Sequence, residues 1–382
     1  MMANIKYMKE FAFYQQLKFY YDTNRGKIRS RYNDLTKKFL AYNDKGTNPN
    51  AFLRKPQFEA LEMYVFIKEF MDNTQVYEMF DDWRNNRNKF SDVSYYSVNK
   101  HGQSGLFDEG VATVTDTLFK QMKKYKEAYP NYIYALTMGL GKTILMATCI
   151  FYEFLLANKY PKDKRFCHNA LVFAPDKTVL QSLREIITFD KSLVVPPEYA
   201  RVLDANIHFH FLEETGKSLH TIDDSDFNII ISNTQKIIIK KKRKEPKASE
   251  ILFGEDSLLS SIYGDATIVS DDVWDESSLM DNQRFKKLCR LPQLGVYVDE
   301  AHHLFGADLE KQIRAKTASK TSLRHTINML AEKTSIVACY NYTGTPYVNK
   351  QLLPEVVYAY GLKESIQNGY LKDADPIAFE NV

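Results

Sequence analysis

A glycine-rich turn at residues 137–143, with the sequence TMGLGKT, contains the residue types that bind nucleotide phosphates. Gly139 and Gly141 can aim backbone N–H groups at phosphate oxygens, because neither carries a Cβ that would block the approach. Lys142 is expected to reach the β- and γ-phosphates, and the Thr143 hydroxyl is expected to ligate Mg²⁺. The rest of the cradle is formed by Met138, Leu140 and Ile144. The turn therefore predicts a site for ATP, with Mg²⁺ as its cofactor.

A pair of adjacent carboxylates, Asp299 and Glu300, directly follows an apolar run at residues 295–298. In parallel α/β sheets the ligand crevice lies at the carboxyl ends of the strands, which is where this pair would stand. Asp299 is expected to hold Mg²⁺, mostly through the water shell of the ion. Glu300 is expected to orient and deprotonate the water that attacks the γ-phosphate. His302 would link the nucleotide to the rest of the site.

These residues need a sheet to position them, and the pattern from residue 131 onward predicts one. Short apolar, β-branched runs alternate there with helical stretches, which indicates parallel strands covered by helices. The runs are 132–136, 170–174, 207–212, 227–232, 295–298 and 335–342. The organisation expected from this pattern is a mainly helical region at 1–130, an α/β lobe at 131–355 and a connector at 356–382.

Composition excludes several other classes of protein. The chain has 382 residues, 44% hydrophobic and 26% charged, which is enough for a substantial core and for two or three domains. A formal net charge of +3 does not by itself imply a polyanion partner, so any basic surface must be local. The four cysteines form no CxxC pair, which argues against a zinc cluster and against a disulfide scaffold. Without a signal peptide or a bilayer-spanning apolar run, we expect a cytoplasmic protein with no membrane partner.

Three motifs together resemble the first motor lobe of DEAH-type superfamily 2 helicases and translocases: GLGKT at 139–143, DEAH at 299–302 and TGTP at 343–346. Leu136 stands where the first glycine of a phosphate loop usually lies, and members of this superfamily often lack that glycine. The resemblance implies a RecA-like P-loop NTPase lobe that binds and hydrolyses ATP and moves along DNA. It also implies that Thr343 and Thr345 couple the nucleotide state to movement.

Further resemblances concern base recognition and DNA contact. LRKPQFEAL at residues 53–61 is similar to the adenine-reading motif of these motors, which implies that Gln57 hydrogen-bonds the base and that Arg54 belongs to the same site. The long distance from this motif to the phosphate loop implies an inserted subdomain between them. A basic insertion at 236–247 suggests phosphate contacts, although a solvated loop or a nuclear-localisation look-alike would have the same composition. The residues expected to contact DNA are Pro175, Thr234, Gln235, Lys240, Lys241 and Lys242.

Within the superfamily, the resemblance is closest to the restriction subunit of type III restriction-modification enzymes, through LR-x-PQ-x-EAL, DEAHH and residues 357–372. This implies a methyltransferase subunit as a possible partner that reads the DNA site. Motors of this class also use a second helicase lobe that brings an arginine finger, and no arginine follows Arg324 in this chain. We therefore expect a piece or a subunit of a larger enzyme, weakly active or inactive alone. The alternative is a non-hydrolysing, nucleotide-dependent module that binds DNA or a partner.

Overall fold

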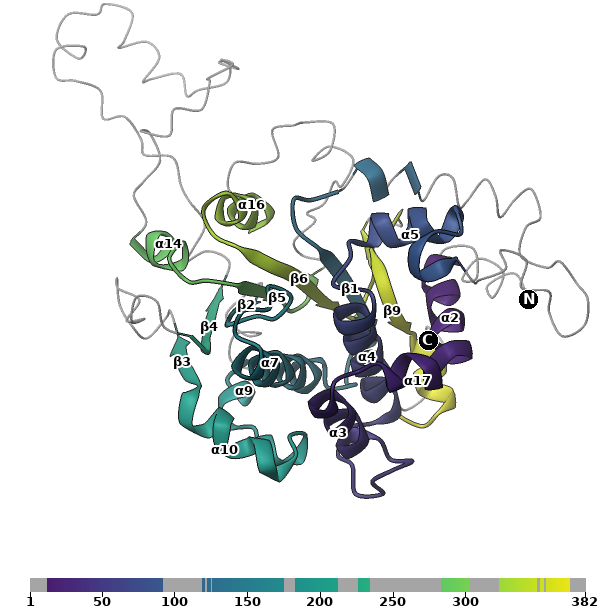
Figure 1. Cartoon of the computed structure of the whole chain (residues 1–382), viewed down its shortest axis with the longest axis horizontal. Helices are drawn as coiled ribbons and strands as arrows, with labels where there is room; N and C mark the ends of the chain where they lie inside the picture. Colours follow the sequence, from purple (N-terminus) through teal and green to yellow (C-terminus); the bar gives the residue numbers. More distant parts are fainter. Residues whose placement is uncertain are drawn as a thin grey trace, which may run out of the picture.

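A parallel sheet forms the centre of the molecule (Figure 1). The computed structural model describes residues 12–91, 119–120, 122–124, 126–174, 183–211, 226–233, 283–301, 323–348, 351–353 and 355–371. The strands are β1 (Asn131–Leu136), β2 (Asn169–Ala174), β3 (His208–Phe211), β4 (Asn228–Asn233), β5 (Leu294–Val298), β6 (Ile336–Thr343), β7 (Tyr347–Val348), β8 (Gln351–Leu352) and β9 (Val356–Tyr360). Strands β1 to β6 and β9 form one all-parallel sheet in the order β3-β4-β2-β5-β6-β1-β9, and β7 pairs with β8 in an antiparallel ribbon.

The described helices lie before, between and after these strands. They are α2 (Ala12–Ser30), α3 (Asp34–Asn43), α4 (Lys55–Val65), η1 (Phe66–Phe70), α5 (Val76–Arg84), η2 (Asn88–Phe90), α7 (Lys142–Lys159), α9 (Glu185–Thr188), η3 (Lys191–Leu193), α10 (Pro197–Asn206), α14 (Gln283–Leu288), α16 (Leu323–Lys333) and α17 (Leu362–Gln367). Among them, no helix combines the length and apolar character needed to cross a membrane. Helices on both faces of a parallel sheet define an α/β fold, which confirms the α/β class predicted from the sequence.

The six apolar runs of the sequence coincide with β1 to β6, to within one residue at each end. Strand β9 lies in the stretch that was expected to be a connector. It pairs in parallel with β1, from Ile133 opposite Val356 to Leu136 opposite Tyr360. The sheet therefore continues past the boundary expected at residue 355, because the buried residues of β9 complete the free edge of β1.

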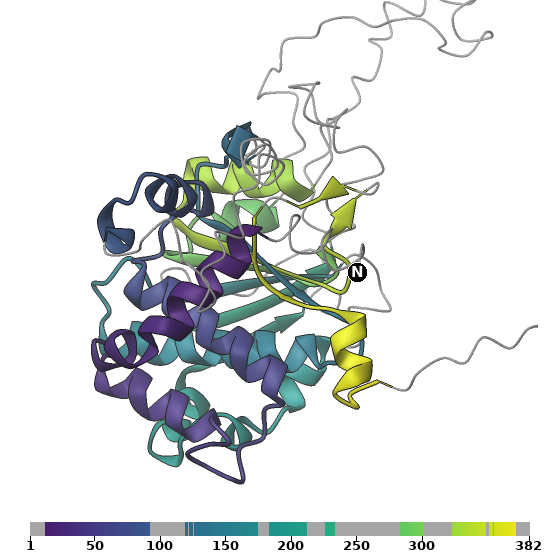
Figure 2. The ribbon, with the colours of Figure 1, turned by 90° about the vertical axis from the view of Figure 1, so that its right-hand side faces the viewer.

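Alternation along β5 separates the two faces of the sheet. Tyr297 belongs to the larger apolar cluster, which α7 and the N-terminal helices build with the sheet. Val296 and Val298 belong to a smaller cluster on the opposite face, built with α14 and α16. Figure 2 shows these helix layers from the side, with the strands between them. Every residue of β5 is buried, so the acidic motif follows a strand that is fixed on both faces.

The helices that precede β1 share the core of the sheet. Helix α2 packs on β9, α4 lies along α7, and α4 also contacts β9. The apolar side chains of α2, α4, η1 and α5 belong to the same buried cluster as those of β1, β6 and β9. The N-terminal helices are therefore one layer of the α/β structure, and they bring the stretch 53–61 toward the phosphate loop.

Candidate functional site

The phosphate loop connects the buried strand β1 to the amino end of α7. Gly139 and Gly141 have φ values of 80° and 72°, which glycine adopts without the strain that a Cβ would cause. Helix α7 begins at Lys142, and its N-cap residue, Gly141, has no side chain that could cap the first turn. The first N–H groups of a helix lack intrahelical partners and favour negative charge, so this end of α7 offers donors to an anion.

The stretch expected to read adenine packs directly on this loop. Gln57 donates from Nε2 to the backbone carbonyl of Gly141 at 3.0 Å, and Arg54 donates from a guanidinium nitrogen to the carbonyl of Gly139 at 3.1 Å. The Gln57 carbonyl oxygen accepts the backbone N–H of Arg54 at 2.9 Å, and Gln57 is only 3% exposed. In this structure the Gln57 side chain is therefore hydrogen-bonded to the phosphate loop. Its contact with an adenine base stays a prediction.

The acidic motif meets the phosphate loop through an ion pair. Lys142 Nζ lies 3.0 Å from Glu300 Oε1, with both side chains largely shielded from solvent. Glu300 has a φ of 47°, in the left-handed region that non-glycine residues seldom occupy. Its backbone N–H donates to the Asp299 carboxylate at 2.9 Å, and the Asp299 N–H donates to the carbonyl of Phe173 on β2. These bonds hold both carboxylates at the carboxyl edge of the sheet.

Asp299 lies in an environment that disfavours its charged form. Burial raises the pKa of Asp299 to about 6, and the neighbouring charge of Glu300 acts in the same direction. Lys142 and the N–H of Glu300 oppose this shift of the pKa. A carboxyl group whose negative charge is this poorly compensated favours a cation beside it.

The donor chemistry fits Mg²⁺. Asp299 and Thr143 offer oxygen atoms, which this hard cation prefers over nitrogen or sulfur. Within the described part of the chain, no three His, Cys, Asp or Glu side chains cluster as a closed metal cage would require. Mg²⁺ usually keeps several waters and takes one or two protein ligands together with phosphate oxygens, so a sparse set of oxygen donors suits it.

The TGTP turn at the end of β6 lies against the same loop. A Cβ added at Gly344 would stand 3.2 Å from Met138 Cγ and 3.7 Å from Lys142 Nζ. The Thr343 hydroxyl accepts the N–H of Thr345 at 3.1 Å and donates to the carbonyl of Thr345 at 2.9 Å, which closes the turn. Thr343 is fully buried. The structure thus brings the three motifs together at adjacent strand ends, because β5, β6 and β1 are neighbours.

Other expected site residues lie outside the described residues: His302, Pro175, Thr234, Gln235, Lys240, Lys241 and Lys242. The strands that lead toward two of these positions are described. Strand β2 ends at Ala174 and β4 ends at Asn233, at the same edge of the sheet as the phosphate loop. The predictions that concern DNA contact accordingly stay predictions.

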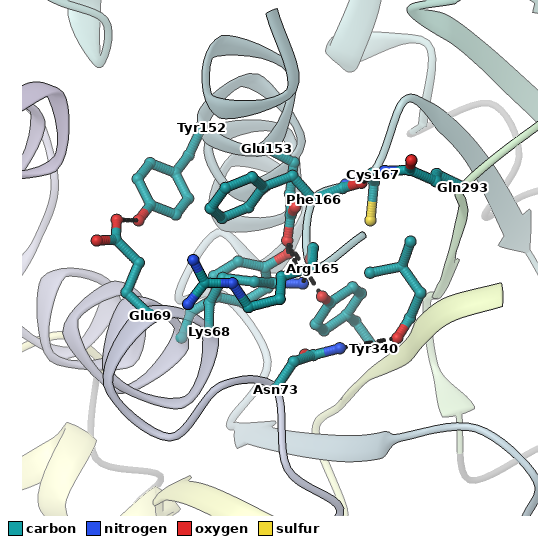
Figure 3. A network of polar contacts seen from close by, with 12 residues as sticks. Lys68, Glu69, Asn73, Tyr152, Glu153, Arg165, Phe166, Cys167, Gln293 and Tyr340 are labelled. Carbon is teal, nitrogen blue, oxygen red and sulfur yellow. Dashed lines mark hydrogen bonds and ion pairs between the residues drawn. The ribbon is translucent and has the colours of Figure 1, made fainter. Parts of the chain in front are cut away.

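A buried polar network behind the site was not foreseen from the sequence (Figure 3). Its centre is the ion pair between Lys68 Nζ and Glu153 Oε1, 2.9 Å apart. Tyr64 and Tyr340 each donate a hydroxyl hydrogen bond to the same oxygen of Glu153. The signal available in the sequence was Glu153 itself, the one charged residue between positions 143 and 158 of an otherwise apolar helix. Such a residue is rarely buried without a dedicated partner.

A cavity of about 410 Å³ lies between α2 and α4, and its lining residues include none of the phosphate loop. Lys55, Phe58 and Glu59 of α4 line it together with residues of α2, and Tyr358 of β9 reaches it too. Oppositely charged side chains pair along its wall, as Lys18 does with Asp22. This cavity therefore shows no excess of either charge that would identify a ligand.

Neither a protein-family model nor a curated protein matches this chain. The chemistry of the site follows from its own residues: a lysine, two carboxylates, a helix N-terminus and glycines in the left-handed conformation. Such a set can bind a polyphosphate with its cation and activate a water molecule.

Proposed function

We propose that this chain is a nucleotide-binding motor lobe, which binds ATP with Mg²⁺ and hydrolyses it to drive movement on DNA. One observation carries the proposal: Lys142 of the phosphate loop lies 3.0 Å from Glu300 of the acidic motif, at the amino end of α7. Phosphate binding requires a cation such as Lys142, and activation of water requires a carboxylate such as Glu300. The fold brings these two residues together although they are far apart in the sequence.

The ion pair suggests how the two residues act in sequence. When a nucleotide enters, its phosphates compete with Glu300 for the Lys142 ammonium group. Lys142 then neutralises phosphate charge, and the released Glu300 carboxylate can accept a proton from the attacking water. Thr143 and Asp299 would hold Mg²⁺, which supplies further neutralisation of the charge on the transferring phosphoryl group.

The contact between the TGTP turn and the phosphate loop supports a coupling role for Thr343 and Thr345. Gly344 lies against Met138 and Lys142, so a shift of the lysine toward phosphate changes the space next to the turn. The turn is closed by its own hydrogen bonds and can move as a unit. Through these contacts, a movement of Lys142 on nucleotide binding would shift the TGTP turn at the carboxyl end of β6.

The strand order supports a RecA-like P-loop lobe, because β6 with its TGTP turn lies between the phosphate-loop strand β1 and the acidic strand β5. DNA, a second helicase lobe with an arginine finger and a methyltransferase subunit are the partners that the type III resemblance suggests. A restriction or phage-defence enzyme is the corresponding proposed context.

Hydrolysis of MgATP tests this function. Phosphate release is measured for the chain alone, with DNA, and with a second lobe supplied, for wild type, Lys142→Ala and Glu300→Gln. We expect DNA-stimulated release in the complete form, reduced by roughly 10²–10⁴-fold in Glu300→Gln, the usual contribution of a general base. Nucleotide binding with release that never appears would favour the non-hydrolysing binding module. Release that persists in Glu300→Gln would exclude the assigned base.

A further inference from the structure

The helical segment formed by α4 and η1, residues 55–70, runs parallel to α7 and is fixed to it at two points. At one end Gln57 donates to the carbonyl of Gly141, just before α7 begins. At the other end Lys68 forms its ion pair with Glu153. The spacing from Gln57 to Lys68 matches the spacing from Gly141 to Glu153 to within one residue. The two helical segments therefore lie side by side in one register.

The ion pair between Lys68 and Glu153 prevents residues 55–70 from sliding along α7. Lys68 is 1% exposed and Glu153 is fully buried. Besides Glu153, the Lys68 ammonium group donates to the carbonyl of Arg165 at 2.7 Å. The second carboxylate oxygen of Glu153 accepts the N–H of Cys167 at 2.9 Å. A shift of residues 55–70 along α7 would leave a buried charge without its partner, which a low-dielectric interior strongly disfavours.

The same network touches the strands that carry the other two motifs. Tyr64 lies 3.2 Å, hydroxyl to hydroxyl, from Tyr297 of β5, which precedes Asp299 by two residues. The Tyr340 ring of β6 is packed between the rings of Tyr64 and Tyr297, with centroids 4.8 and 4.9 Å away. Residues 55–70 are thereby held relative to β5, β6 and α7 together.

We propose that residues 55–70 act as a positioning strut for the phosphate loop, and that the Lys68–Glu153 ion pair sets its register. By fixing this register, Lys68 holds Gln57 and Arg54 against the carbonyls of Gly141 and Gly139. Lys68 is accordingly a positioning residue that acts through Gln57 and Arg54. The inference rests on the proposed nucleotide function of the loop, and it names how the protein keeps that loop in its binding conformation.

Hydrogen exchange at the amides of residues 139–143 in the nucleotide-free full chain tests the strut directly. Lys68→Met should raise exchange at the loop, and Gln57→Ala combined with Arg54→Ala should raise it to a similar extent. In the background that carries both Gln57→Ala and Arg54→Ala, Lys68→Met should add nothing at the loop, because both contacts between the strut and the loop are already lost. Additive effects, or a loop that exchanges as in wild type in Lys68→Met, would overturn the strut.

Two further variants distinguish a specific loosening of the phosphate loop from a general loss of stability. Arg324→Met also removes the cation of a well-packed ion pair, here with Glu127, but away from the strut, so it should leave loop exchange at the wild-type rate. Lys68→Met combined with Glu153→Gln leaves no charge unpaired, so it should fold readily and still loosen the loop. Loosening by Arg324→Met as large as by Lys68→Met would assign the effect to stability and overturn the inference.

MgATP affinity, measured by calorimetry, separates this inference from the proposed function. Lys68→Met should weaken binding roughly fivefold to tenfold, the effect of losing one hydrogen bond at the site. Binding that is unchanged in Lys68→Met while wild type binds would overturn the strut. A wild-type chain that does not bind MgATP would contradict the proposed function, and loop exchange would still decide whether the strut exists.

Discussion

The ammonium group of Lys142 and the carboxylate of Glu300 are 3.0 Å apart, so the phosphate loop and the acidic motif meet in one ion pair. The two groups that would act on a bound nucleotide neutralise each other in the free protein. Under the proposed function the phosphates would compete with Glu300 for Lys142, so mutations of the two residues should have opposite effects on nucleotide affinity.

Glu300→Gln is expected to bind MgATP more tightly than wild type, by roughly fivefold. The variant frees Lys142 from an attractive partner, and a partly shielded ion pair is worth about 1 kcal/mol. Lys142→Ala should instead weaken binding, because the phosphates lose their cation. Isothermal titration calorimetry measures both constants, with Glu332→Gln on the exposed side of α16 as a control that should match wild type. Weaker binding by Glu300→Gln would contradict the proposed competition.

Gly141→Ala is expected to disable the phosphate loop. The residue has a φ of 72°, and an added Cβ would stand 2.7 Å from Gln57 Nε2, closer than real Cβ contacts allow. Left-handed backbone costs a non-glycine residue about 1–2 kcal/mol, and the displaced Gln57 adds to this cost. Urea unfolding and MgATP titration should both show the loss. Gly26→Ala in α2 has open space around its Cβ and should be neutral or slightly stabilising.

Two buried tyrosines should respond differently to loss of the hydroxyl group. Tyr64 donates to Glu153 at 2.6 Å, so Tyr64→Phe should lower the free energy of unfolding by roughly 1.5–3 kcal/mol, as for hydrogen bonds to charged groups. The Tyr134 hydroxyl is buried without a hydrogen-bond partner among the described residues, so Tyr134→Phe should be neutral or stabilising. Equal losses in the two variants, measured by chemical unfolding, would contradict the hydrogen bond assigned to Tyr64 and Glu153.

Glu355 should make stability fall as pH rises toward neutrality. Burial raises the pKa of Glu355 to about 7, against the opposing effects of Arg324 and of the hydrogen bond from Asn131. The unfolded chain releases this proton near pH 4.5, so folding takes one up between pH 4.5 and 7. The stabilising contribution is complete below pH 4.5 and is lost as pH passes 7.

The variant Glu355→Gln removes this titration. Wild type should lose on the order of 1–3 kcal/mol more than Glu355→Gln between pH 5 and pH 8, measured by urea unfolding at both values. Parallel losses in the two proteins would show that Glu355 ionises in the folded state as it does in the unfolded chain.

Local sequence patterns were sufficient to predict the first six strands of the sheet. Each is a short apolar run whose buried faces are occupied by its own β-branched and aromatic residues, so the pattern and the structure coincide. Strand β9 has a similar composition, but its assignment depends on the free edge of β1, which lies far away in the chain. Pairing between distant segments is not encoded in any local pattern.

In the candidate site, too, some features follow from local sequence and others depend on contacts between distant segments. The glycines at positive φ, the lysine at the start of α7 and the carboxylates after β5 follow from local sequence and strand order. The hydrogen bond from Gln57 to Gly141 and the ion pair from Lys68 to Glu153 depend on how residues 55–70 pack along α7. Packing of this kind depends on side-chain shapes in three dimensions, and no motif describes it.

The position of β9 also has a consequence for how the chain folds. The ring of Tyr14 in α2, near the start of the described chain, packs edge-on against the ring of Tyr358 in β9, with centroids 5.8 Å apart. Helix α2 thus packs on a strand that follows it by more than three hundred residues in the chain. Contacts between such distant segments slow folding, because a long loop must close before they form. Until β9 has been synthesised, the part of α2 that packs on it lacks this partner.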